Sequence, residues 1–238
     1  MKLDILAFGA HPDDVELGCG GTLAKEIAAG KKVGIVDLTR GELGTRGSAE
    51  IRDSEAARSA RLLGVAVREN LRMRDGFLIN DESHQLQIIQ MIRKYCPEMV
   101  ICNAVDDRHI DHGKGSRLVS DACFLSGLRK IGTVMDGREQ EAWRPAVVYH
   151  YIQWKNIEPD VVVDISDFIE KKIEAIMAYD SQFYKPGSDE PVTPIATRNF
   201  LDSIRYRAQD LGRLIGTEYA EGFTAERPVA VSRLTDLI

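Results

Sequence analysis

Residues 3–14, LDILAFGAHPDD, decide the fold, because an apolar run is followed at once by a histidine, a proline and two aspartates. The run at residues 3–10 is typical of a buried strand. It is too short for a secretory signal and lacks a small-residue cleavage site. A helix is predicted next, over residues 20–29, with Gly30 as its stop.

The same alternation of strand and helix continues along the chain. Further strands are predicted at residues 32–38, 65–71, 99–102, 147–152 and 161–165. Further helices are predicted at residues 49–63, 85–95, 115–128, 168–179 and 199–214. Such βαβ units predict an α/β fold with a single-domain, mostly parallel, Rossmann-like sheet and helices on both faces. We expect residues 1–238 to form one domain, with residues 184–197 as a surface loop.

Composition excludes several classes of protein. The 238 residues are 44 % hydrophobic and 29 % charged, as in an ordinary globular protein and unlike a disordered chain or a small disulfide scaffold. The net charge of −6 provides no basic field for nucleic acid, and no stretch of 18 apolar residues is present to span a membrane. The four cysteines form no CxxC pair, which favours reduced thiols and a cytoplasmic location.

Two polar loops follow predicted strands, at residues 9–14 and 106–112, and they hold three of the five histidines. Ligands of parallel sheets bind at the carboxyl ends of strands, so we expect these loops to meet. His11, Asp14 and His112 supply the three protein ligands of a catalytic zinc, with a fourth position left to water. Two histidines and a carboxylate are also the ligands of non-haem iron oxygenases.

The neighbouring residues predict proton transfer at that centre. Asp13 must point away from Asp14 if Asp14 binds metal, and it is then free to act as a general base. His109 and Asp111 lie two residues apart, so in an extended segment they project the same way and the carboxylate holds the imidazole tautomer. The alternative is that residues 11–14 are only a turn and a helix cap, with acidic residues at the helix dipole.

These motifs resemble a known family. His11-Pro12-Asp13-Asp14, followed by Glu16 and the GCGG run at residues 18–21, is similar to the first motif of the zinc-dependent LmbE/PIG-L deacetylases. His109-x-Asp111-His112 matches the second motif, and residues 38–47 and 181–184 extend the likeness. Within the family the chain looks most like the bacillithiol-biosynthesis deacetylases, which act on N-acetylglucosaminyl malate.

The resemblance implies a role for each matched residue. His11, Asp14 and His112 would hold Zn²⁺, although Fe²⁺ or another divalent ion could fill the same site. Asp13 would be the general base, and His109, steadied by Asp111, would donate a proton or stabilise the oxyanion. The substrate would be an acetylated amino-sugar glycoside, and relatives form homo-oligomers, often hexamers.

Four more residues are candidates for substrate binding: Glu42, Arg52, Asp75 and Arg108. Glu42 could accept hydrogen bonds from sugar hydroxyls, and the family uses an acidic residue there. Arg52 could clamp a hydroxyl or a carboxylate, and Arg108 could meet a malate carboxylate. Each is equally consistent with a surface charge or a turn residue. Whether Tyr184 or His150 lines the site is left open.

Three alternatives to an N-acetylglucosaminyl malate deacetylase remain at this point. The first is a deacetylase of another GlcNAc conjugate. The second is a non-haem iron oxygenase, although that chemistry is usual on an all-β barrel. The third is a catalytically silent zinc- or sugar-binding module, in which Asp13 and the His109/Asp111 pair would have no use, because binding alone needs no base.

Overall fold

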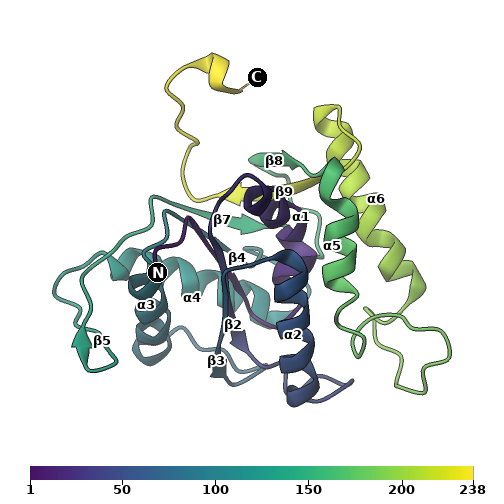
Figure 1. Ribbon diagram of the computed structural model, residues 1–238, viewed down its shortest axis with the longest axis horizontal. Coiled ribbons are helices and arrows are strands. Elements are labelled where there is room, and N and C mark those ends of the chain that lie inside the picture. Colours follow the sequence, from purple (N-terminus) through teal and green to yellow (C-terminus); the bar gives the residue numbers. More distant parts are fainter. Residues whose placement is uncertain (238) are drawn as a thin grey trace.

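Strand β1 (Ile5–Gly9) lies inside a seven-stranded sheet of order β3-β2-β1-β4-β7-β9-β8. This computed structural model describes residues 1–237 (Figure 1). The other strands of the sheet are β2 (Val33–Thr39), β3 (Val67–Met73), β4 (Met99–Cys102), β7 (Val147–Tyr151), β8 (Val161–Asp164) and β9 (Ala220–Ala225). Every residue of β1 and β2 is buried, as expected for strands covered on both faces.

The sheet is mostly parallel, which confirms the predicted fold class. Strands β3, β2, β1, β4 and β7 pair in parallel with their neighbours. Strand β9 is antiparallel to both β7 and β8. The sequence does not predict β9, because Glu221 and Gly222 interrupt its apolar pattern. A small hairpin of β5 (Val134–Met135) and β6 (Arg138–Glu139) was also not predicted.

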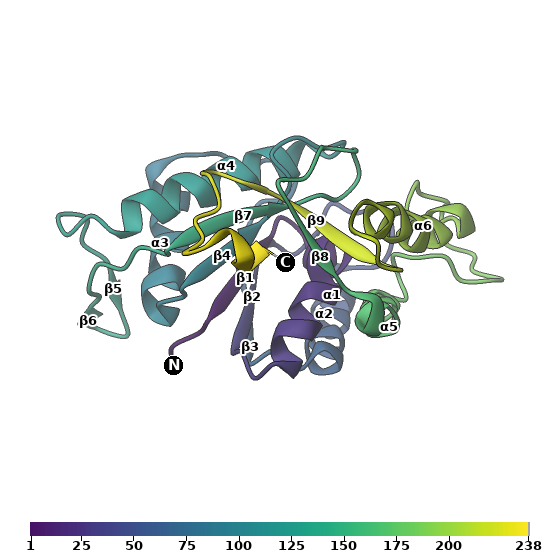
Figure 2. The same ribbon diagram turned by 90° about the horizontal axis from the view of Figure 1, so that it is seen from above.

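Two layers of helices cover the sheet (Figure 2). Helices α3 (Glu82–Tyr95) and α4 (Ile110–Ser126) pack on one face, where alternate residues of β1 such as Leu6 and Phe8 point. Helices α1 (Asp14–Ala28) and α5 (Ile169–Ile176) pack on the other face against Ile5 and Ala7. This two-residue alternation is the period expected of a strand between two layers. The remaining helices are α2 (Ala49–Leu63), α6 (Arg198–Ile215) and the short 3-10 turns at Ser166–Phe168 and Leu234–Leu237.

Two helices begin earlier than predicted, and both changes concern the candidate site. Helix α1 begins at Asp14 rather than at residue 20, and α4 begins at Ile110 rather than at residue 115. The first turns of both helices consist largely of polar residues, so the spacing of apolar residues does not predict them as helix. As a result Asp14 and His112 lie in the first turns of helices that start at the carboxyl edge of the sheet.

Helix α1 is broken at Cys19, whose φ of −145° is not helical. A buried ion pair fills the break: the Glu221 carboxylate accepts hydrogen bonds from the amides of Gly21 and Thr22 at 2.9 and 2.7 Å. Lys172 Nζ lies 2.6 Å from Glu221 Oε1 and donates to the carbonyl of Leu17 at 2.8 Å. The carboxylate therefore caps the second half of the helix, and the ammonium satisfies the end of the first.

The segment at residues 184–197 joins α5 to α6 without regular strand or helix, as predicted. Thr193, Pro194 and Ile195 from this segment reach the pocket described below. Across residues 1–237, no helix combines the length and the apolar character that crossing a membrane requires.

Candidate active site

A pocket of about 310 Å³ opens at the carboxyl ends of the parallel strands. Its walls come from the loops that follow β1, β2, β3, β4 and β7, and from residues 193–195. These loops gather there because parallel strands all end at the same edge of the sheet. The two polar loops singled out in the sequence therefore do meet, and the pocket is where they meet.

Asp14 lies between the two imidazoles predicted as its fellow metal ligands. Its Oδ2 is 3.4 Å from His11 Nδ1, and its Oδ1 is 3.2 Å from His112 Nε2. Two ligand atoms bound at about 2.0–2.1 Å to a tetrahedral zinc are roughly 3.3 Å apart. Both distances therefore fit two ligands of one ion.

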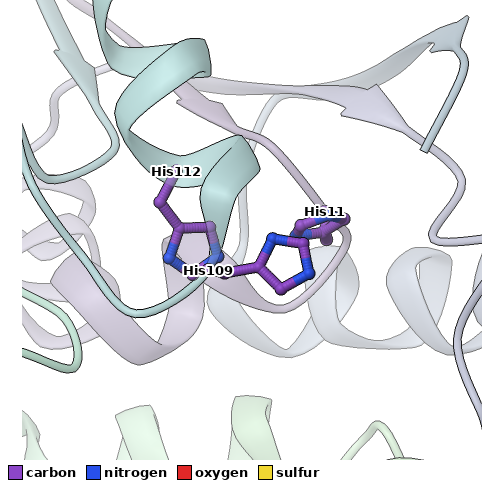
Figure 3. A group of neighbouring side chains, drawn as sticks. All are labelled: His11, His109 and His112. Carbon is purple, nitrogen blue, oxygen red and sulfur yellow. The ribbon is translucent and has the colours of Figure 1, made fainter. Parts of the chain in front are cut away.

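His109 brings a third imidazole to the same place (Figure 3). Ligand nitrogens of His11, His109 and His112 lie within 4.8 Å of one another, so these three residues are also a candidate ligand set. His109 caps α4, however: its Nδ1 accepts the amide N–H of Asp111 at 3.3 Å. Only Nε2 of His109 is then free to face the pocket. Burial and the two neighbouring imidazoles lower the pKa of His109, which favours its neutral form.

Each of the other two imidazoles has one ring nitrogen within hydrogen-bond distance of a carboxylate oxygen. Asp107 Oδ2 is 2.8 Å from His112 Nδ1, and Asp75 Oδ1 is 3.0 Å from His11 Nε2. Such partners fix the tautomer of a metal-bound histidine and leave its other nitrogen for the ion. Although burial lowers the pKa of His112, Asp14 and Asp107 together raise it to about 9. The surroundings thus favour positive charge, and the residues fit a divalent cation.

Asp14 is held by two amide side chains that the sequence did not point to. Asn103 Nδ2 donates to Asp14 Oδ2 at 3.0 Å, and Gln153 Nε2 donates to Asp14 Oδ1 at 2.7 Å. Asn103 also accepts the amide N–H of Ala10 at 2.8 Å. Both follow strands next to β1 or β4 in the sheet, so the rule that found the two histidine loops could have found them as well.

Asp13 turns away from Asp14 and toward Arg52. Its Oδ2 is 3.1 Å from Arg52 Nη2, and Arg52 also donates to the carbonyl of Pro12. Burial raises the pKa of Asp13 to about 7, although Arg52 opposes the rise. The backbone φ of 112° at Asp13 is a strained conformation for a non-glycine residue. The backbone conformation and the ion pair together fix the position of this carboxylate, which lines the pocket.

Asp111 does not contact His109 in the predicted way. His109 itself is extended, but α4 begins at Ile110, so residues 109–111 do not form the extended segment that would project both side chains the same way. The fully buried Asp111 carboxylate instead accepts the amide N–H of Gly76 at 2.6 Å and lies 3.5 Å from His11 Nε2. Asp111 is thus placed to hold His11 and the loop after β3.

Three of the four predicted substrate residues line the pocket. Arg108 is exposed there with its guanidinium 4.6 Å from the Trp154 ring, and Arg52 reaches it beside Asp13. Asp75 lines it too, but its two oxygens already bond His11 and the amide of Leu43. Glu42 is the exception, because its carboxylate accepts the amide N–H of Asp75 instead of lining the pocket.

The two residues left open lie outside the pocket. His150 is buried below Asn103, with Nε2 at 3.0 Å from Glu226 Oε1, and it is not in the pocket wall. Tyr184 is also not among the pocket residues in the described part of the chain. Arg46, which the sequence did not single out, is buried in that wall.

Known proteins resemble the chain in sequence. A family model described as GlcNAc-PI de-N-acetylase, PIG-L, matches residues 6–123. The diacetylchitobiose deacetylase of Thermococcus kodakarensis is 30 % identical over 231 residues, which cover 92 % of this chain and 81 % of that protein.

Solved structures resemble the chain over nearly its whole length. The conserved protein TT1542 of Thermus thermophilus is 36 % identical, with a TM-score of 0.86 and 98 % of both chains covered. The N,N'-diacetylchitobiose deacetylase of Pyrococcus horikoshii is 28 % identical, with a TM-score of 0.80 over 98 % of this chain and 88 % of that one. A hydratase from Pseudomonas putida has the same fold at 21 % identity and a TM-score of 0.77, so the fold alone does not fix the reaction.

Proposed function

This chain belongs to the PIG-L family of de-N-acetylases, and we propose that it is a zinc-dependent hydrolase that removes the N-acetyl group from a GlcNAc-type conjugate. The observation that carries the proposal is the position of Asp14 between His11 and His112, with the Asp13 carboxylate in the same pocket. An ion bound by three protein side chains would keep its remaining coordination position open to water or substrate.

In this proposal His11, Asp14 and His112 hold the ion, with Fe²⁺ as the alternative to Zn²⁺. When bound, the ion supplies a Lewis acid that polarises the acetyl carbonyl and makes water more acidic. Asp107 and Asp75 set the tautomers of the two histidines, and Asn103 and Gln153 fix the Asp14 carboxylate. None of these outer residues needs to touch the substrate.

Asp13 then accepts the proton of the attacking water and delivers it to the leaving amine. Arg52 keeps that carboxylate oriented through its 3.1 Å contact. His109 has Nδ1 occupied by the Asp111 amide, so its Nε2–H is the donor that can meet the oxyanion of the tetrahedral intermediate. Asp111 acts on His11 and on the loop at Gly76 in this proposal, and not on His109.

For the substrate we propose N-acetylglucosaminyl malate and hence a step of bacillithiol biosynthesis. Support comes from Arg108, which lies at the pocket with its guanidinium against Trp154 and has no carboxylate partner among the side chains that the structure describes. A free guanidinium there suits a malate carboxylate. The alternative is a neutral conjugate such as diacetylchitobiose, the substrate in the names of two relatives.

The proposal extends to the protein as a whole. Residues 1–238 would form one deacetylase domain, which agrees with the 98 % coverage by the Thermus thermophilus protein. The four free cysteines agree with a cytoplasmic location. We keep a homo-oligomer, with a hexamer as the expected form, as a prediction that light scattering of the purified protein tests.

Acetate release from N-acetylglucosaminyl malate tests the reaction. We expect release that a chelator abolishes and added zinc restores. Oxygen consumption would support an iron oxygenase instead, and metal binding without turnover would support a binding module. His112→Ala should lose both zinc and activity, whereas His84→Ala, which changes a histidine at the start of α3, should keep both. A full metal content in His112→Ala would remove that residue from the ligand set.

A further inference from the structure

Arg46 is buried in the pocket wall without a counter-charge. The residue is 5 % exposed and belongs to the loop between β2 and α2. Its side chain makes one hydrogen bond, from Nη2 to Ser188 Oγ at 3.2 Å, and its buried Nε has no partner. No carboxylate of the described residues lies within 4.0 Å of the guanidinium; Asp189 and Glu190, next to Ser188, are not paired with it either.

The other buried arginines of the molecule differ from Arg46. Arg52 pairs with Asp13, and Arg93 donates to three backbone carbonyls and to the hydroxyl of Thr133. Arg68, whose side chain is 7 % exposed, lies between Glu16 and Asp37. Each of these buried guanidinium groups thus has carboxylate partners or several carbonyl acceptors within the protein. A buried cation without such partners costs stability, and an anion from outside can remove that cost.

The surroundings of Arg46 show where such an anion would lie. The apolar residues Leu43, Pro194 and Ile195 line the same pocket. Arg108 presents a second guanidinium to this pocket, at its exposed rim. The acidic residues near the metal ligands are already engaged: Asp13 with Arg52, and Asp75 with His11. The pocket thus contains, besides the paired carboxylates near the metal ligands, two guanidinium groups that have no carboxylate partner among the described side chains.

We infer that Arg46 binds an anionic group of the substrate, a carboxylate or a phosphate, and that it selects conjugates that carry such a group beside the acetylated sugar. The inference rests on the proposed deacetylase function and deepens it. The planar fork of a guanidinium fits either anion through two parallel hydrogen bonds, which a lysine ammonium cannot form. Arg46 is in this reading a specificity-determining residue, and it takes no part in the proton transfers.

Steady-state kinetics on three substrates test this assignment: N-acetylglucosaminyl malate, N-acetylglucosamine 1-phosphate and neutral diacetylchitobiose. In Arg46→Gln we expect KM for the preferred anionic substrate to rise about 10- to 100-fold with little change in kcat. KM for diacetylchitobiose should stay within about twofold. Arg46→Lys should recover part of the loss, and the comparison of malate with phosphate identifies the anion.

Arg40→Gln is the matched control, because it removes the same charge from an arginine that pairs with Asp53 and Glu50 outside the pocket. We expect it to behave as wild type. An equal loss on charged and neutral substrates in Arg46→Gln would mean a structural role and would overturn the inference. So would unchanged kinetics on all three substrates.

Direct binding separates failure of this inference from failure of the proposed function. Malate and inorganic phosphate are titrated by calorimetry into wild type, Arg46→Gln and Arg46→Lys. We expect at least one of the two anions to bind wild type and to bind Arg46→Gln about tenfold or more weakly. This result can be obtained even if no acetate is released from any substrate. Equal binding to wild type and to folded Arg46→Gln, or no binding to either, contradicts the assignment.

Discussion

Two charged regions of this molecule differ in how their arginines are paired. Beneath the pocket, Arg68 lies 2.6 Å from Glu16 and 2.8 Å from Asp37, and Ser59 also donates to Glu16 at 2.6 Å. In the pocket wall, Arg46 and Arg108 have no carboxylate partner in the described chain. In the first region the protein itself supplies the compensating charges, whereas for the second we propose that a bound anion supplies them. The comparison predicts that loss of Arg68 lowers stability, whereas loss of Arg46 weakens the binding of an anionic substrate.

The largest effect should come from Asp13→Asn on the pocket side. We expect kcat for acetate release to fall about 10²- to 10⁴-fold, because the amide cannot accept the proton of water. The metal content should remain that of wild type, and the free energy of unfolding in urea should not decrease. A kcat close to wild type would refute the base assignment and would weaken the contrast between the two regions.

Arg68→Met should produce the next largest effect, on stability. Removing this guanidinium leaves Glu16 and Asp37 buried without their partner, so we expect the free energy of unfolding to fall by about 3–5 kcal/mol. The folded fraction should retain KM near wild type, since Arg68 does not line the pocket. Urea titration and kinetics on the same preparation measure both. A variant as stable as wild type would show that the paired network is not needed for folding.

The pH dependence of the free energy of unfolding should distinguish the contribution of Asp13 from that of Arg68 and its carboxylate partners. In chelator-treated protein the pKa of Asp13 is raised by burial to about 7, above the usual 3.8. The folded state then binds this proton more tightly than the unfolded state. The contribution of Asp13 to the free energy of unfolding is therefore fully present below about pH 4 and is lost as the pH rises to about 7. Between pH 5 and 8 we expect wild type to lose roughly 2–3 kcal/mol relative to Asp13→Asn. Parallel pH profiles of the two proteins would contradict the shift.

The smallest effect is expected at Asp107, which lies behind His112. Asp107→Asn should weaken metal affinity about 10- to 100-fold, because the tautomer of His112 is then less well fixed. Competition with a chromogenic chelator measures this change. Asp106→Asn is a suitable control, since Asp106 pairs with Lys155 at the surface. Equal affinities in wild type and Asp107→Asn would show that the carboxylate has no influence on the ion.

The sequence predicted the parallel sheet well because β1, β2 and β4 are short apolar runs with turn residues between them. It also identified the two loops that meet, since strand ends in a parallel sheet share an edge. It failed where polar residues begin a helix: α1 and α4 each begin several residues earlier than predicted, and in the first turn of α4 the Asp111 carboxylate lies 3.5 Å from His11 Nε2. Arg46 and Glu42 lie in one loop, and only the folded chain shows which of them reaches the pocket.

The break in α1 has a consequence for how this pocket can be adjusted. The single turn that carries Asp14 is joined to the rest of the helix at Cys19 and is steadied there by Lys172 and Glu221, residues far along the chain. We expect substitutions around the break at Cys19 to change the orientation of that turn, while the longer half of the helix stays packed on the sheet. Substitutions around Lys172 and Glu221 are therefore a way to move the Asp14 carboxylate slightly without changing a residue that takes part in the reaction.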